Sequence, residues 1–257
     1  MALKKKLTEA QLKKEKADNA IVYKVVIAMA LMCLCVMGLR RLRAYYSSWG
    51  GIQVLFDKIP IFTIIGAALA VVSLVLLIVL RKKVIRMVCP WTLAAGAFVV
   101  LVGFTMQHTM TDQFPLLYFV CAAGFILYII FQLYRWEFFL MSFTTLTTGG
   151  GFFAFSRGYS LAGDGKWILL VLVIVWIITT ACAFLASRNK GRIVLGKINY
   201  PMFSSRFTPV LLYVVNGLWV VCTIVGLVFG SLFSYYCMFV AIAVEFIAAV
   251  YYTFQLK

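Results

Sequence analysis

Charged side chains are scarce in this chain of 257 residues. Only 12% of the residues are Asp, Glu, Lys or Arg, whereas 64% are hydrophobic, and the mean hydropathy is +1.01. A water-soluble domain of this length would still need a polar surface, and the sequence holds too few polar residues to form one. This composition excludes a soluble globular protein.

Side chains that commonly carry catalysis or bind metals are also few. The chain has 8 acidic residues and one histidine, and it lacks the HExxH, GxSxG and phosphate-binding glycine motifs. An enzyme is therefore the less favoured class, although a serine–lysine or lone-acid mechanism stays open. The seven cysteines lie in or beside apolar runs without zinc-site spacing. We expect no metal and no cofactor.

Signals of the eukaryotic secretory pathway are absent as well. The sequence contains no Asn-x-Ser/Thr sequon and no retention or lipidation motif. This is compatible with the cytoplasmic membrane of a bacterium, and we favour that location.

Long apolar runs dominate the chain after residue 19. About 20 apolar residues match the hydrocarbon thickness of a bilayer, and a helix satisfies its own backbone groups there. We expect an all-α, polytopic membrane bundle, with a basic cytoplasmic segment over 1–19 and a transmembrane domain over 20–257. The eight expected spans are approximately 20–39, 60–80, 90–107, 115–134, 138–156, 167–186, 208–230 and 233–254.

The distribution of basic residues predicts the orientation. Lys and Arg number 24 against 8 acids. With eight spans and the N-terminus inside, 17 basic residues lie inside and 6 outside; if segment 138–156 does not cross, the counts become 13 and 10. The positive-inside rule favours eight spans with both termini cytoplasmic. Arg40, Arg41 and Arg43 run against this topology, which places them outside.

The longest polar connection, residues 187–207, carries basic residues and no acids. We expect it to contact anionic lipid headgroups on the cytoplasmic side, or a membrane-protein partner. We expect no nucleic-acid partner, because no recognition motif accompanies the charge. The basic residues of this connection are Arg188, Lys190, Arg192, Lys197 and Arg206.

Glu245 is the most conspicuous ionisable residue within a span, since burial of such a group in lipid is costly. It shares a helix face with small residues, which suggests contact with another helix. Asn216 lies 15 residues before Ser231 and Glu245 lies 14 after it, so an antiparallel hairpin would bring Asn216 and Glu245 to one depth. We interpret the pair either as a proton, ion or substrate site or as an interhelical hydrogen bond that fixes helix register.

The fifth span contains a threonine- and glycine-rich stretch, Ser142–Gly151. It resembles the pore-helix end and filter of potassium channels, but it lacks the valine and tyrosine of that core, and a filter needs a re-entrant segment. The same residues are typical of a broken helix that lines a polar cavity, or of a packed helix. As a broken helix, the stretch would contribute Thr147, Thr148 and Gly149 to a binding site.

Two functional hypotheses remain. The first is a non-enzymatic scaffold or accessory subunit of a membrane complex, because the chain has short loops, few buried charges and a basic inner surface. The second is a small transporter or ion-conducting protein that binds its ion or substrate at Glu245 and Asn216.

Overall fold

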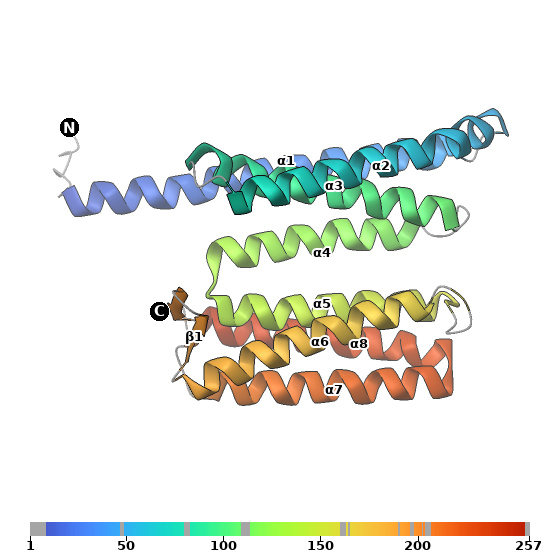
Figure 1. The fold of residues 1–257 in the computed structure, drawn as a ribbon. Coiled ribbons are helices and arrows are strands. Elements are labelled where there is room, and N and C mark those ends of the chain that lie inside the picture. Colours follow the sequence, from blue (N-terminus) through green and yellow to red (C-terminus); the bar gives the residue numbers. More distant parts are fainter. Residues whose placement is uncertain are drawn as a thin grey trace, which may run out of the picture. The chain divides into compact units, whose positions relative to one another are not determined.

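The computed structural model describes residues 9–46, 49–79, 83–108, 114–159, 163, 165–189, 191–195, 198–201, 203 and 207–254. These residues form eight helices and one short β-hairpin (Figure 1). The helices are α1 (Glu9–Tyr46), α2 (Trp49–Val79), α3 (Lys83–His108), α4 (Phe114–Leu133), α5 (Trp136–Ser156), α6 (Gly165–Arg188), α7 (Phe207–Phe229) and α8 (Ser231–Phe254). The hairpin pairs β1 (Arg192–Leu195) with β2 (Ile198–Pro201) in antiparallel register.

Seven helices among the described residues are long and apolar enough to cross a membrane. Their spanning stretches are Ile21–Tyr45, Asp57–Leu77, Phe114–Leu133, Trp136–Ser156, Gly165–Arg188, Pro209–Phe229 and Ser231–Phe254. Within α3, only the shorter stretch Trp91–Gly103 meets the apolar criterion. The predicted polytopic helical bundle is confirmed, and the third expected span, 90–107, stays a prediction.

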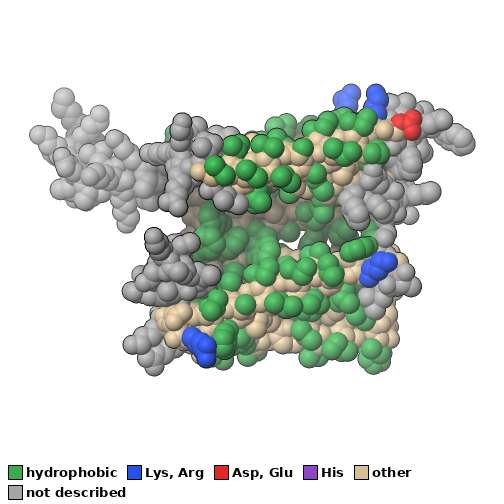
Figure 2. Space-filling model, in the orientation of Figure 1, with side chains coloured by type: hydrophobic (Ala, Val, Ile, Leu, Met, Phe, Trp, Pro, Cys, Tyr) green, Lys and Arg blue, Asp and Glu red, His purple; other side chains and the backbone are tan. Residues whose placement is uncertain are grey.

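Hydrophobic side chains cover the outward faces of these helices. Figure 2 shows them along the helices on one face of the molecule, where the Lys, Arg and acidic side chains that can be seen lie near the helix ends. Many of these apolar side chains are more than half exposed, including Ile177 at 62% and Phe246 at 70%. Such faces suit contact with lipid tails or with the helices of another membrane protein.

The chain divides into two compact units. The first comprises Met1–Met32 and Phe119–Lys257, and the second comprises Cys33–Tyr118. In the second unit α2 packs against α3, and the hydroxyls of Ser73 and Thr92 share a hydrogen bond of 2.8 Å across the pair.

Helix α5 is the centre of the first unit, where it packs against α6, α7 and α8. Of its most apolar stretch, 67% is buried, whereas no other described spanning helix exceeds 33%. Its main polar and aromatic contacts join Thr148 to Trp176 of α6, Phe152 to Trp219 of α7, and Phe138 to Tyr252 of α8. This central place accounts for the small and polar residues of α5, because they meet neighbouring helices rather than lipid.

The structure corrects the idea that the glycines break this helix. Helix α5 runs without interruption through Gly149–Gly151, and its 21 residues extend about 31 Å, enough to cross the hydrocarbon core. The Thr144 and Thr147 hydroxyls donate to the carbonyls of Leu140 and Phe143, one turn earlier. Both a re-entrant filter and a broken helix at this stretch are therefore wrong.

One end of the first unit gathers the start of α5, the end of α6, the hairpin and the start of α7 (Figure 1). Between α5 and α8, the described basic residues at that end are Arg135, Arg188 and Arg192, and those at the opposite end are Arg157 and Lys166. Which end faces the cytoplasm stays a prediction from the charge count of the sequence.

Candidate functional site

Buried polar side chains gather inside the α5–α8 bundle, where an unpaired polar group is costly because neither water nor lipid replaces its hydrogen bonds. Most of the threonines make hydrogen bonds within the bundle. Groups that lack a partner are therefore the ones most in need of an explanation. Among the described residues, the buried atoms without one are Ser142 Oγ, Thr145 Oγ1, Asn216 Oδ1, Trp219 Nε1, Thr223 Oγ1 and both carboxyl oxygens of Glu245.

Glu245 lies on the face of α8 that packs against α5. Ala241, Ala248 and Tyr252 share this face at helical spacing, and all three are buried. Both oxygens of the Glu245 carboxyl are shielded from the surface and have no hydrogen-bond partner. The carboxyl therefore lies in a protein interface, as its small neighbours in the sequence suggest.

The matching face of α5 carries Phe138, Ser142, Thr145 and Gly149, each at helical spacing from the next and all buried. The two helices run antiparallel: the rings of Phe138 and Tyr252 stack at 5.0 Å, and a Cβ at Gly149 would lie 3.4 Å from Ala241 Cβ. These two contacts fix the register and bring Thr145 to the depth of Glu245. The Ser142 hydroxyl is near enough to interact with the Glu245 carboxyl, although the pair does not reach hydrogen-bond geometry.

Asn216 does not pair with Glu245, contrary to the sequence-based expectation. Its Nδ2 donates to the hydroxyls of Thr179, at 3.1 Å, and Thr180, at 2.9 Å, both on α6. The spacing of residues along the hairpin predicts the depth of Asn216 but not the rotation of its helix. A different face of α7 meets α8. There Cys237 Sγ of α8 donates to the backbone carbonyl of Cys222 of α7 at 3.5 Å.

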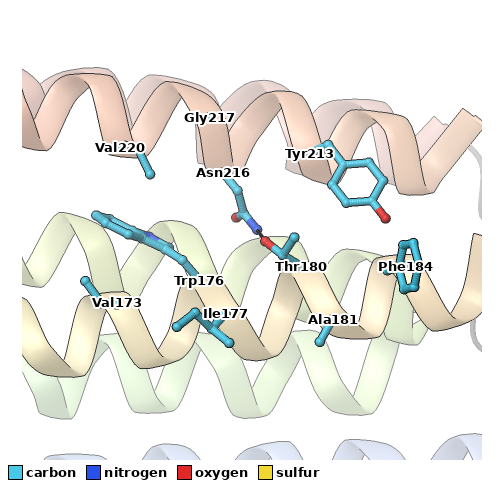
Figure 3. A pocket seen from close by; sticks show the side chains of 10 residues that line it. All are labelled: Val173, Trp176, Ile177, Thr180, Ala181, Phe184, Tyr213, Asn216, Gly217 and Val220. Atoms are coloured by element: carbon cyan, nitrogen blue, oxygen red, sulfur yellow. Dashed lines mark hydrogen bonds between the residues drawn. The ribbon is translucent and has the colours of Figure 1, made fainter.

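A groove runs between α6 and α7, with a volume of about 790 Å³ (Figure 3). Its walls include Ile177, Phe184 and Val220, and its polar lining comes from Thr180, Asn216 and Tyr213. Figure 3 shows the Asn216 amide nitrogen directed at Thr180 and the carbonyl oxygen turned away from it. That oxygen is the atom that lacks a partner.

The Thr and Gly candidates of α5 have packing contacts. Thr147 donates to its own helix backbone, Thr148 accepts a hydrogen bond of 3.0 Å from Trp176 Nε1, and Gly149 faces Ala241. The structure therefore separates the predicted ion-binding residues: Gly149 lies on the face of α5 that meets Glu245, Thr148 bonds to α6, and Asn216 lies on the groove side. Whether any of them binds an ion or substrate stays a prediction.

Two of the basic residues expected to contact lipid or a partner are described. Arg188 ends α6 and lies over the ring of Phe184, with its guanidinium carbon 5.1 Å from the ring centroid. Arg192 begins β1. Lys190, Lys197 and Arg206 lie outside the described residues.

Sequence reasoning missed two features. Ser142 and Thr145 belong to the threonine-rich stretch, and their spacing to Gly149 alone predicts that the three share one face of the helix. The amino-acid sequence does not predict the α6–α7 groove, because the groove depends on how the two helices lie beside each other.

Spanning helices, lipid-compatible outer faces and a partly polar interior define the class of this protein: a polytopic helical membrane protein. No family model matches the chain, and comparison with curated proteins and with solved structures found no match. The specific role must be argued from the groove and the buried polar groups.

Proposed function

We propose that this chain is a non-enzymatic accessory subunit of a membrane complex, and that it binds a transmembrane helix of a partner protein in the α6–α7 groove. The observation that carries the proposal is the half-satisfied amide of Asn216 beside Gly217. Asn216 is only 5% exposed, its nitrogen makes two hydrogen bonds, and its oxygen makes none.

Asn216 Oδ1 is a hydrogen-bond acceptor without a donor. Lipid tails offer none, so a lipid in the groove would leave Asn216 Oδ1 unpaired. A helix that carries Ser, Thr, Asn or Gln at the matching depth supplies the donor from its side chain. Oδ1 is itself shielded from the surface, so it meets a donor in the groove only if the amide rotates and gives up its bonds to Thr179 or Thr180.

The shape of the groove also suits a helix. Gly217 and Ala181 are exposed small residues in its lining, and a Cβ at Gly217 would meet no atom within 4 Å. Small residues allow two helix backbones to approach closely, which is the main way in which helices associate in lipid. Ile177 and Val220, both exposed, give the approaching helix apolar contacts on either side.

The basic connection beside the groove adds a second contact in this proposal. Arg188 lies in the last turn of α6, close in sequence to Phe184 of the groove wall, and Arg192 follows in β1. Together with Lys190, Lys197 and Arg206 they would hold this end of the chain at the anionic headgroups of a bacterial cytoplasmic membrane.

Filling the groove is expected to release the partner. In Gly217→Leu, the new side chain enters open space, so the chain should fold normally while the partner helix is excluded. The fraction of the chain in the larger complex should fall about tenfold or more, the equivalent of at least 1.4 kcal/mol. The measurement is native electrophoresis of the tagged chain after mild extraction from its own membrane.

Gly124→Leu is the matched control. Gly124 is an exposed glycine of α4 that likewise has nothing within 4 Å, but it does not line the groove. The control should leave the complex intact. A wild-type chain that migrates alone would contradict the accessory role, and equal complexes in both variants would contradict the groove as the docking surface.

Transport is the alternative function, and the observation in its favour is the buried, unpaired carboxyl of Glu245. It has less support, because the predicted pairing with Asn216 is absent. The two functions differ in an assay of flux: a transporter would lose flux in Glu245→Gln, whereas the Gly217→Leu change would leave it intact.

A further inference from the structure

We propose that Glu245, Ser142 and Thr145 form a binding site for one monovalent cation of the size of Na⁺ between α5 and α8. This inference does not rest on the proposed partner helix, because the site lies on a different interface of the bundle.

Four oxygen atoms on the facing helix surfaces have unused acceptor capacity. They are the two carboxyl oxygens of Glu245, Ser142 Oγ and Thr145 Oγ1, and all four are shielded from the surface. Carboxylate and hydroxyl oxygens are the ligands that hard cations prefer. The two hydroxyls can donate to the carboxylate as well as accept, but no described basic side chain lies on these two facing surfaces. A buried carboxylate there is therefore incomplete without a cation or a proton.

The two hydroxyls differ from their neighbours on α5. Thr144 and Thr147 donate to carbonyls of their own helix, and Thr148 accepts a hydrogen bond from Trp176. Serine and threonine in a helix usually satisfy their hydroxyls in this way. Ser142 and Thr145 make no such bond, and they are the two on the face that meets α8.

Charge balance favours a monovalent ion. A single carboxylate neutralises one positive charge, whereas a divalent ion would leave an excess charge in a medium of low dielectric. Among the described residues no group of three His, Cys, Asp or Glu side chains is placed to hold a metal ion. Glu137, the acid of α5, lies at the start of the helix and interacts with Tyr252.

Close packing limits the size of the ion. Helices α5 and α8 approach so closely that a Cβ on Gly149 would already touch Ala241. Four oxygens at such an interface can surround a small ion, whereas a larger ion such as K⁺ needs more ligands at longer distances. An occupied site would join α5 to α8, so the stability of the first unit would depend on Na⁺.

Radioactive ²²Na⁺ binding to the purified full-length chain in detergent, with choline chloride as the background salt, tests the site. The wild type should bind one ion per chain, and excess K⁺ should displace it poorly. Glu245→Gln, Ser142→Ala and Thr145→Val should each weaken binding by about tenfold or more, since each removes a ligand to a buried charge. Thr144→Val is the matched control, because that hydroxyl already bonds to its own helix.

Infrared spectroscopy of the wild type gives a second test that needs no variant. Replacement of Na⁺ by choline should convert a carboxylate band into the carbonyl band of a protonated acid, because the buried carboxyl then takes up a proton. Binding that is absent from the wild type or unchanged in Glu245→Gln would overturn the proposal. A protonated band at every Na⁺ concentration would overturn it too, and would identify Glu245 as a neutral structural acid. Tighter binding of K⁺ than of Na⁺ would overturn the proposal that the site fits an ion of the size of Na⁺.

Discussion

Leucine in place of Gly96 is expected to force α2 and α3 apart and to destabilise the second unit by about 3 kcal/mol. A Cβ at Gly96 would lie 2.8 Å from the backbone nitrogen of Ala70 and 2.8 Å from the carbonyl oxygen of Gly66. Backbone atoms cannot rotate away as a side chain can, so the two helices must separate. Their separation would also break the hydrogen bond between Ser73 and Thr92.

Thermal unfolding of the purified protein in lipid nanodiscs measures this effect. Gly38→Leu is the control, because Gly38 belongs to the same unit, is exposed and has nothing within 4 Å of its Cβ position. The control should unfold like the wild type, whereas Gly96→Leu should unfold at a clearly lower temperature. Equal stability of the two variants would mean that α2 and α3 do not pack through Gly96.

Alanine in place of Trp219 is expected to cost about 3–5 kcal/mol, the second large effect. Trp219 is completely buried in the first unit, and its ring meets the edge of Phe152 at a centroid distance of 6.2 Å. The change leaves a cavity between α7 and the central helix α5, and the lost packing contacts are what hold helices together in lipid. The same unfolding measurement applies.

Trp219→Phe separates packing from hydrogen bonding. The indole nitrogen of Trp219 has no partner, so its removal alone should cost less than the loss of the whole ring. Trp167→Ala is the surface control, because that side chain is 53% exposed, and its change should stay within about 0.5 kcal/mol. A similar cost for Trp219→Ala and Trp167→Ala would contradict the central place of α5.

The membrane helices were predictable because lipid imposes a simple rule on the sequence. A span needs about 20 apolar residues, and it must satisfy its backbone internally. The expected span 138–156 accordingly corresponds to α5, Trp136–Ser156, although threonine and glycine make it the least apolar of the seven. The charge count favoured the same crossing, because a crossing fifth span places most basic residues on one side.

The candidate site was less predictable, because sequence spacing gives depth and local face but not the rotation of one helix against another. Glu245 was correctly expected to face a helix rather than lipid, from the alanines around it. Its expected partner Asn216 lies on the α6 side of α7, whereas α7 meets α8 at Cys222. The residues opposite Glu245, Ser142 and Thr145, come from α5, more than ninety positions away in the sequence.

Photocross-linking from position 217 tests the central claim, that the α6–α7 groove receives a partner helix, most directly. A photoreactive amino acid at that position, irradiated in intact membranes, should give one discrete protein adduct. The adduct should vanish in the Asn216→Leu background, because the acceptor for the donor of the partner is lost, and should not form from position 124. An adduct of twice the mass of the chain would identify a second copy instead. Adducts of lipid alone, or a protein adduct unaffected by Asn216→Leu, would contradict the account.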